Sequence, residues 1–138
     1  MAISKIWVVA EPTEAGLTNT TLELLTAARS LAGTVEVVTW GPNAAQSAAV
    51  AGEYGASALH DVGDLGQSLP GTSVASAIAG AIAAGTGPDA ILIPTSYDGR
   101  DIAGRLSAKC DLPVLTNITG LEGGHDLLAT EHGVLGGQ

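Results

Sequence analysis

An uninterrupted apolar run, Asp89–Pro94 (DAILIP), constrains the fold of this chain more than any other feature. A strand with one face in water alternates apolar and polar residues, whereas a run without alternation is typical of a strand covered on both faces. Ile3–Ala10 and Thr34–Trp40 are also apolar and rich in β-branched residues, which favour strands. Because parallel strands need crossover connections that lie over the faces of the sheet, these segments predict a parallel sheet between layers of helices.

The segments between these strands have the apolar spacing, caps and glycine stops of helices. Strand and helix therefore alternate along the chain, which predicts an α/β, Rossmann-like three-layer domain with a mostly parallel sheet. No linker divides residues 1–138, so a single domain is expected. The predicted helices are Thr18–Ala32, Ala44–Tyr54, Thr72–Ala84 and Asp98–Lys109; further strands are Ala56–Val62 and Val114–Leu121; Asp126–Thr130 and His132–Leu135 are predicted to form a short antiparallel meander at the C-terminal end.

The charge balance excludes two classes of partner. The chain of 138 residues has five basic and fourteen acidic residues, a formal net charge of −9. Nucleic acids and anionic membrane surfaces both attract basic patches, so neither is a predicted partner.

Cys110 is the single cysteine, which excludes an internal disulfide and fits a reducing compartment. The sequence has no run of about 18 apolar residues, which is the length of a membrane span, and we expect a cytoplasmic protein.

No catalytic, metal or phosphate motif is found. The first strand leads into Glu11–Gly16, where a dinucleotide-binding domain has its glycine-rich turn, and the two carboxylates of this segment would repel a phosphate. His60, His125 and His132 have no carboxylate or cysteine at the spacing of a metal site. The residues by themselves therefore predict a soluble Rossmann-like domain with no visible active site.

The helix after the DAILIP strand holds the candidate interaction site, because ligands and partners of α/β domains gather at the carboxyl ends of the strands. Asp98 is predicted to cap this helix, and Asp101 and Arg105 to form an ion pair one turn apart. The positive charge of Arg100 opposes the dipole at the start of the helix. Arg100 is therefore placed either for a partner or as a solvated arginine paired with Asp98, Asp101 or another nearby carboxylate. The candidate interface residues are Ser96, Asp98, Gly99, Arg100 and Arg105.

Four segments together resemble the N-terminal domain of electron transfer flavoprotein alpha subunits. The most specific is Thr95–Leu106 (TSYDGRDIAGRL), which continues into Leu112–Ile118 (LPVLTNI). The others are the opening-helix segment Thr21–Arg29, the short segment Glu53–Ala56, and the closing glycine pair in Val134–Gln138.

The resemblance implies a fold similar to adenine nucleotide alpha hydrolases, with a degenerate nucleotide pocket. It also implies a scaffold role without catalysis, pairing with a beta subunit and supporting a domain that holds FAD. The complete assembly would take electrons from flavin dehydrogenases. The Gln-His-containing flavin signature of such subunits is not found, so this chain is expected to bind no FAD by itself and to be either a fragment or a naturally short relative.

Two other hypotheses are open. A nucleotide-binding module of the universal-stress-protein kind has similar size and alternation, but it needs a glycine-rich phosphate loop late in the chain. Gly99–Gly104 is the one candidate, and its spacing is wrong. An enzyme that holds an anion with Arg100 and Arg105 would need a base or nucleophile that the sequence does not offer.

Overall fold

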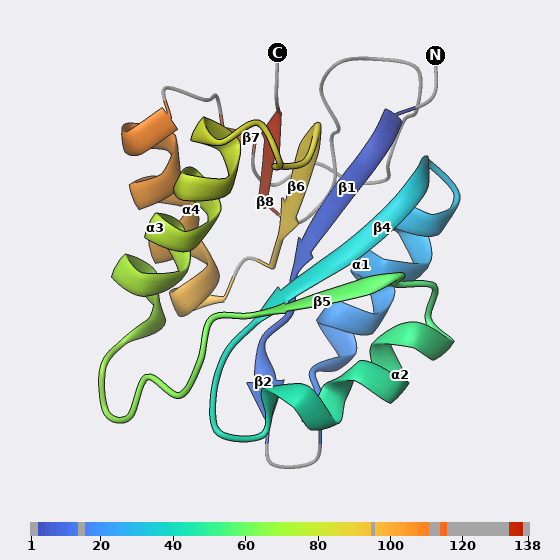
Figure 1. Ribbon diagram of the computed structural model, residues 1–138, viewed down its shortest axis with the longest axis horizontal. Coiled ribbons are helices and arrows are strands. Elements are labelled where there is room, and N and C mark those ends of the chain that lie inside the picture. Colours follow the sequence, from blue (N-terminus) through green and yellow to red (C-terminus); the bar gives the residue numbers. More distant parts are fainter. Residues whose placement is uncertain (1–2, 14–15, 95, 111–113, 116–132, 137–138) are drawn as a thin grey trace.

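The computed structural model describes residues 3–13, 16–94, 96–110, 114–115 and 133–136 (Figure 1). They form a six-stranded sheet in the order β5-β4-β1-β6-β8-β7, in which β5, β4, β1 and β6 are parallel. The strands of this sheet are β1 (Ile3–Val9), β4 (Ala32–Thr39), β5 (Ala58–Asp61), β6 (Ala90–Ile93), β7 (Val114–Leu115) and β8 (Gly133–Gly136). The predicted α/β class with a parallel sheet is confirmed.

Helices lie on both faces of the sheet (Figure 1). On one face, α1 and α2 pack against β1 and β4; on the other, α3 and α4 pack against β1 and β6. The helices are α1 (Asn19–Arg29), α2 (Ala48–Glu53), which follows the short 3-10 helix η1 (Ala44–Ser47), α3 (Pro70–Ala83) and α4 (Tyr97–Cys110).

The central strand β1 shows why the apolar runs do not alternate. Ile6 and Val8 point into the core beneath α1, whereas Trp7 and Val9 point into the core beneath α3 and α4. None of these four side chains is more than 4% exposed. All residues of β6 are buried in the same way, so the uninterrupted DAILIP run is explained by burial on both faces.

The helix boundaries shift by up to three residues from their predicted positions. Thr18 caps α1, because its side-chain oxygen accepts a hydrogen bond of 3.2 Å from the backbone N–H of Thr21. The helix α3 begins at Pro70 rather than at Thr72. Proline fits the first turn of a helix because its fixed φ is helical and its missing N–H has no partner there.

The small antiparallel hairpin of the domain lies near the N-terminus, whereas the sequence predicts a short meander at the C-terminal end. It consists of β2 (Pro12–Thr13) and β3 (Gly16–Leu17). The Thr13 hydroxyl donates 2.9 Å to the carbonyl of Gly16, and Gly16 has a φ of 129° that favours glycine. At the C-terminal end, the described strands β7 and β8 instead join the main sheet beside β6; the predicted strand at residues 126–130 lies outside the described residues.

Candidate functional site

The carboxyl ends of β1 and β6 meet at one edge of the sheet, because the two strands are parallel neighbours. This brings Glu11, which follows β1, next to Ser96, which follows β6. The Ser96 hydroxyl donates a hydrogen bond of 2.7 Å to the Glu11 carboxylate. In nucleotide-binding α/β domains the phosphates bind at the carboxyl ends of the parallel strands, where helices begin. In this chain the carboxylate of Glu11 lies at that position.

Ser96 also caps α4. Its side-chain oxygen accepts a hydrogen bond of 3.1 Å from the backbone N–H of Gly99, and its carbonyl accepts one of 2.9 Å from the N–H of Arg100. The prediction that Asp98 is the cap is therefore wrong. The helix begins at Tyr97, so the capping position falls on Ser96, and Asp98 lies in the first turn, where its negative charge favours the helix dipole.

Threonine hydroxyls hold the loop after β1 in the same way. The buried Thr21 accepts a hydrogen bond of 3.2 Å from the backbone N–H of Glu11, and its hydroxyl lies 2.9 Å from that of Thr18. Thr18 in turn accepts the hydrogen bond from the N–H of Thr21 described above. Among the first-turn N–H groups that a phosphate could use as donors, those of Thr21 in α1 and of Gly99 in α4 are therefore already bonded within the chain.

Gly99 is required by the close approach of α4 to the end of β6. It is buried, and a Cβ at this position would overlap the carbonyl oxygen of Pro94. The glycine of the TSYDGRD segment thus has a packing role. Gly71 at the start of α3 is a weaker case, because a Cβ there would overlap only the carboxylate end of the flexible Asp101 side chain.

The structure separates the two arginines of the candidate site. Arg105 donates a hydrogen bond of 2.9 Å from Nε to Asp101, which confirms the predicted pair, and the pair lies against Gly71 at the contact between α3 and α4. Arg105 therefore helps to pack the two helices. Arg100 is exposed, and its side chain has no hydrogen bond or ion pair within the described part of the chain. The alternative in which Arg100 pairs with Asp98 or Asp101 is thus not what the structure shows.

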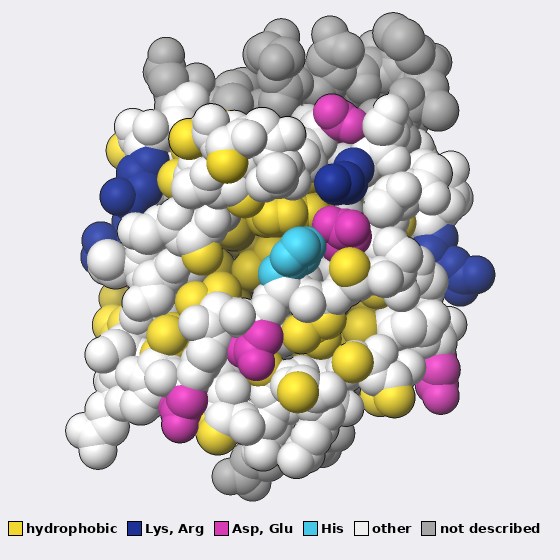
Figure 2. All heavy atoms as spheres, in the orientation of Figure 1, with side chains coloured by type: hydrophobic (Ala, Val, Ile, Leu, Met, Phe, Trp, Pro, Cys, Tyr) yellow, Lys and Arg dark blue, Asp and Glu magenta, His cyan; other side chains and the backbone are white. Residues whose placement is uncertain are grey.

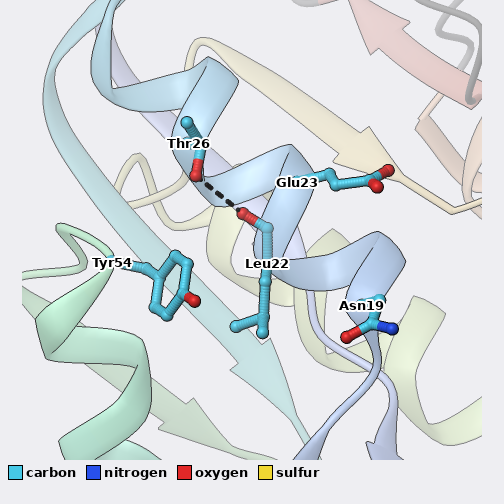
Figure 3. Close-up of a pocket in the computed structure, with 5 residues that line it drawn as sticks. All are labelled: Asn19, Leu22, Glu23, Thr26 and Tyr54. Carbon is cyan, nitrogen blue, oxygen red and sulfur yellow. Dashed lines mark hydrogen bonds between the residues drawn. The ribbon is translucent and has the colours of Figure 1, made fainter.

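Two of the segments that carry the family resemblance, Thr21–Arg29 and Glu53–Ala56, meet between α1 and α2. An open pocket of about 420 Å³ lies there, and Figure 3 shows the ring of Tyr54 and the side chain of Leu22 facing one another across it. The backbone of Gly55 has a φ of 103°, and a Cβ there would overlap the side chain of Arg29. The Tyr54-Gly55 pair and Arg29 therefore join the two helices. The pocket lining is Asn19, Leu22, Glu23, Thr26 and Tyr54.

A polar cluster on the other face of the sheet is absent from the sequence-based prediction. Glu36 on β4 accepts a hydrogen bond of 2.8 Å from the Trp7 indole, and His60 Nε2 lies 2.9 Å from the same carboxylate oxygen. The ring centroids of Trp7 and His60 are 4.5 Å apart. Figure 2 shows a histidine in a hollow of this face, beside an acidic side chain and over hydrophobic ones.

Burial raises the pKa of Glu36, but the hydrogen bonds from His60 and Trp7, together with the charge of Lys5, outweigh this and hold it below its ordinary value. The signal that could have revealed the cluster is a glutamate within an apolar strand, since a carboxylate that loses its water needs partners.

Comparison with known proteins identifies the family. The family model described as "Electron transfer flavoprotein domain" matches residues 6–137. The chain belongs to the electron transfer flavoprotein domain family. No curated protein matches the chain significantly. The family match does not distinguish the alpha from the beta subunit.

Family membership implies a role in an electron transfer flavoprotein, an electron carrier rather than an enzyme. The family also implies a heterodimeric partner and suggests FAD in the full protein. Within the described ranges, no group of three or more His, Cys, Asp or Glu side chains is placed to hold a metal ion. The described helices include none with both the length and the apolar character needed to cross a membrane.

Proposed function

We propose that this chain is the N-terminal domain of an electron transfer flavoprotein alpha subunit, a single domain over residues 1–138. Its role is that of a scaffold in the cytoplasm, which pairs with the beta subunit and supports the FAD domain while electrons arrive from flavin dehydrogenases. The family match over residues 6–137 and the TSYDGRD segment at the start of α4 support this proposal.

The hydrogen bond between Glu11 and Ser96 carries the proposal. It places a negative charge where a nucleotide-binding domain of this fold holds phosphate, and it uses the hydroxyl that caps α4. A phosphate at the carboxyl ends of these strands would meet like charge, and the first-turn N–H groups of Thr21 and Gly99 are already bonded within the chain. This arrangement favours a scaffold over a nucleotide-binding module of the universal-stress-protein kind.

Arg100 supports the partner side of the proposal. Its guanidinium is exposed at the carboxyl edge of the sheet, and within the described part of the chain it has no carboxylate to neutralise it. A carboxylate or carbonyl on a partner subunit is the kind of group that an arginine in this position binds. Arg105, in contrast, contributes to the packing of α3 on α4.

Two titrations of the purified chain test the proposal. In the first, the beta subunit from the same organism is titrated into the chain in a calorimeter, and formation of a stable complex is expected. In the second, ATP and AMP replace the beta subunit, and no heat of binding is expected. Binding of adenine nucleotide without binding of the beta subunit would favour the nucleotide-binding module instead.

A further inference from the structure

The edge strand β5 is less buried than the other parallel strands of the sheet. None of its four residues is buried, whereas half of β4 and all of β6 are buried. One side of β5 pairs with β4, and the order of the described sheet leaves its other side without a partner strand. Short, exposed elements of this kind open locally at a lower free energy than the core of a protein.

The segment 62–69, which leads from β5 to α3, forms two tight turns. The carboxylate of Asp61 accepts a hydrogen bond of 2.8 Å from the N–H of Gly63. The carboxylate of Asp64 accepts one of 2.9 Å from the N–H of Gly66. Both glycines have a positive φ, 112° and 60°, which favours glycine. Because these hydrogen bonds join neighbouring residues, they persist when β5 and this segment move together.

Backbone and apolar contacts hold residues 58–69 against the rest of the domain. Beyond the four pairs of the β4–β5 ladder, the N–H of Val62 donates a hydrogen bond of 2.9 Å to the carbonyl of Thr39 on β4. Leu59 packs against the core beneath α1, and Val62 and Leu65 pack against the core beneath α3 and α4. All three apolar side chains are only partly buried, so their departure exposes less apolar surface than that of a core residue.

Glu36 supplies a side-chain contact between β5 and the rest of the sheet. Its Oε1 accepts a hydrogen bond of 2.8 Å from the Trp7 indole and lies 2.9 Å from Nε2 of His60. Trp7 is 4% exposed, whereas the His60 side chain is 44% exposed. When β5 leaves the sheet, His60 passes into water and the Trp7 indole keeps Glu36 as its acceptor, because β1 and β4 pair over six positions of their own. Opening therefore leaves no buried donor unpaired at this cluster, and the penalty for such a group does not arise.

We propose that residues 58–69 form a strap that opens from the edge of the sheet as one unit, with the contact between His60 and Glu36 as its side-chain latch. Opening of the strap uncovers the apolar side chains against which Val62 and Leu65 pack, while β1, β4 and β6 stay paired. This inference goes beyond the proposed function and does not depend on it, because every contact that it uses lies within the chain.

Hydrogen exchange of single amides, followed by NMR on the whole chain, tests the strap. The Val62 N–H reports opening of the strap. The Ala10 N–H donates a hydrogen bond of 2.9 Å to Val38 between β1 and β4, so it reports unfolding of the sheet. After correction for intrinsic exchange rates, Val62 is expected to be less protected than Ala10, and its exchange should respond less to low concentrations of urea. Equal protection of the two amides would overturn the strap.

A core variant far from β5 shows whether the strap opens separately. Ile93→Val removes one methyl group from a fully buried side chain of β6, which β1 and β4 separate from β5. Because this loss is the same in the closed and the strap-open states, exchange should be unchanged at Val62 and roughly three- to tenfold faster at Ala10. Acceleration of both amides would mean that Val62 exchanges only when the sheet unfolds, which contradicts a separate strap.

The variant His60→Phe tests the latch. Phenylalanine keeps a ring beside Trp7 and favours strands, but it cannot bond the Glu36 carboxylate. The latch is present in the closed state and absent from both the strap-open and the unfolded states. Exchange at Val62 and at Ala10 should therefore rise by the same factor, roughly two- to fivefold, as for a half-exposed polar pair.

The matched control for the latch is Asp61→Asn. It changes a charge on the same strand and retains an acceptor for the N–H of Gly63, so its amides should exchange as those of the wild type do. Unchanged exchange of Val62 in His60→Phe, or an equal acceleration in the control, would show that the contact with Glu36 does not hold the strap.

Discussion

Replacement of Gly99 by alanine tests whether the close approach of α4 to β6 accounts for the glycine of the TSYDGRD segment. The new Cβ would overlap the carbonyl oxygen of Pro94. It would also lie 3.0 Å from the carbonyl carbon of Pro94 and 3.1 Å from the hydroxyl oxygen of Ser96. Pro94 is buried and directly follows β6, all of whose residues are buried. Because the strand cannot move outward, the first turn of α4 has to shift.

The expected cost follows from two effects. Inserting a methyl group into a packed interior costs about 1–3 kcal/mol. The shift also disturbs the Ser96 cap, which contributes about 1 kcal/mol, while alanine returns about 0.5–1 kcal/mol of helix stability. We expect Gly99→Ala to lower the free energy of unfolding by about 2 kcal/mol. With a urea slope of about 1–3 kcal/mol per M, the midpoint should fall by about 1 M.

Urea unfolding followed by far-UV circular dichroism measures this change, and Gly104→Ala is the matched control. The control lies in the same helix, but its Cβ meets nothing within 4 Å, so it should raise the free energy of unfolding by about 0.5–1 kcal/mol. If Gly99→Ala unfolds at or above the wild-type midpoint, the packing explanation for Gly99 is refuted.

Four further predictions address the partner, the core, pH and the cofactor. Arg100→Ala should leave the melting temperature of the chain nearly unchanged, since an exposed charge contributes about 0–1 kcal/mol, but should weaken association with the beta subunit by roughly 2–5 kcal/mol; equal affinity in a calorimetric titration would make Arg100 an ordinary solvated residue. Thr39→Val should raise the free energy of unfolding by about 1 kcal/mol, because its buried hydroxyl has no hydrogen-bond partner among the described residues; a loss of stability in urea would contradict this. The pKa of Glu36 is lower in the folded state than its unfolded value of about 4.5, so the ionised side chain stabilises the fold above about pH 4.5, and this contribution is lost as the pH falls through the folded pKa. The difference in the free energy of unfolding between wild type and Glu36→Gln should therefore shrink on acidification, and a difference that grows would contradict the lowered pKa. The purified chain should be colourless, and visible flavin absorbance in stoichiometric amount would contradict the prediction that it binds no FAD alone.

The sequence by itself determined those features that depend on residues close together along the chain. The apolar runs predict the parallel strands, because burial on both faces removes the alternation of a half-exposed strand. The Thr18 cap and the Asp101–Arg105 pair were predictable because a helix fixes the geometry of residues three and four positions apart. The same local signals placed most boundaries to within two residues, and they mislocated the α4 cap because they assigned its first residue to Asp98 instead of Tyr97.

Only the tertiary structure decided which of these local elements meet. Glu11 and Ser96 are 85 residues apart, and they become neighbours because β6 pairs with β1, an order that no local pattern encodes. The cluster of Trp7, Glu36 and His60 likewise requires β1, β4 and β5 to pair in one register, since a shift by one residue would turn each side chain to the opposite face. Local periodicity fixes which side chains are buried, whereas strand order and register fix which buried side chains meet.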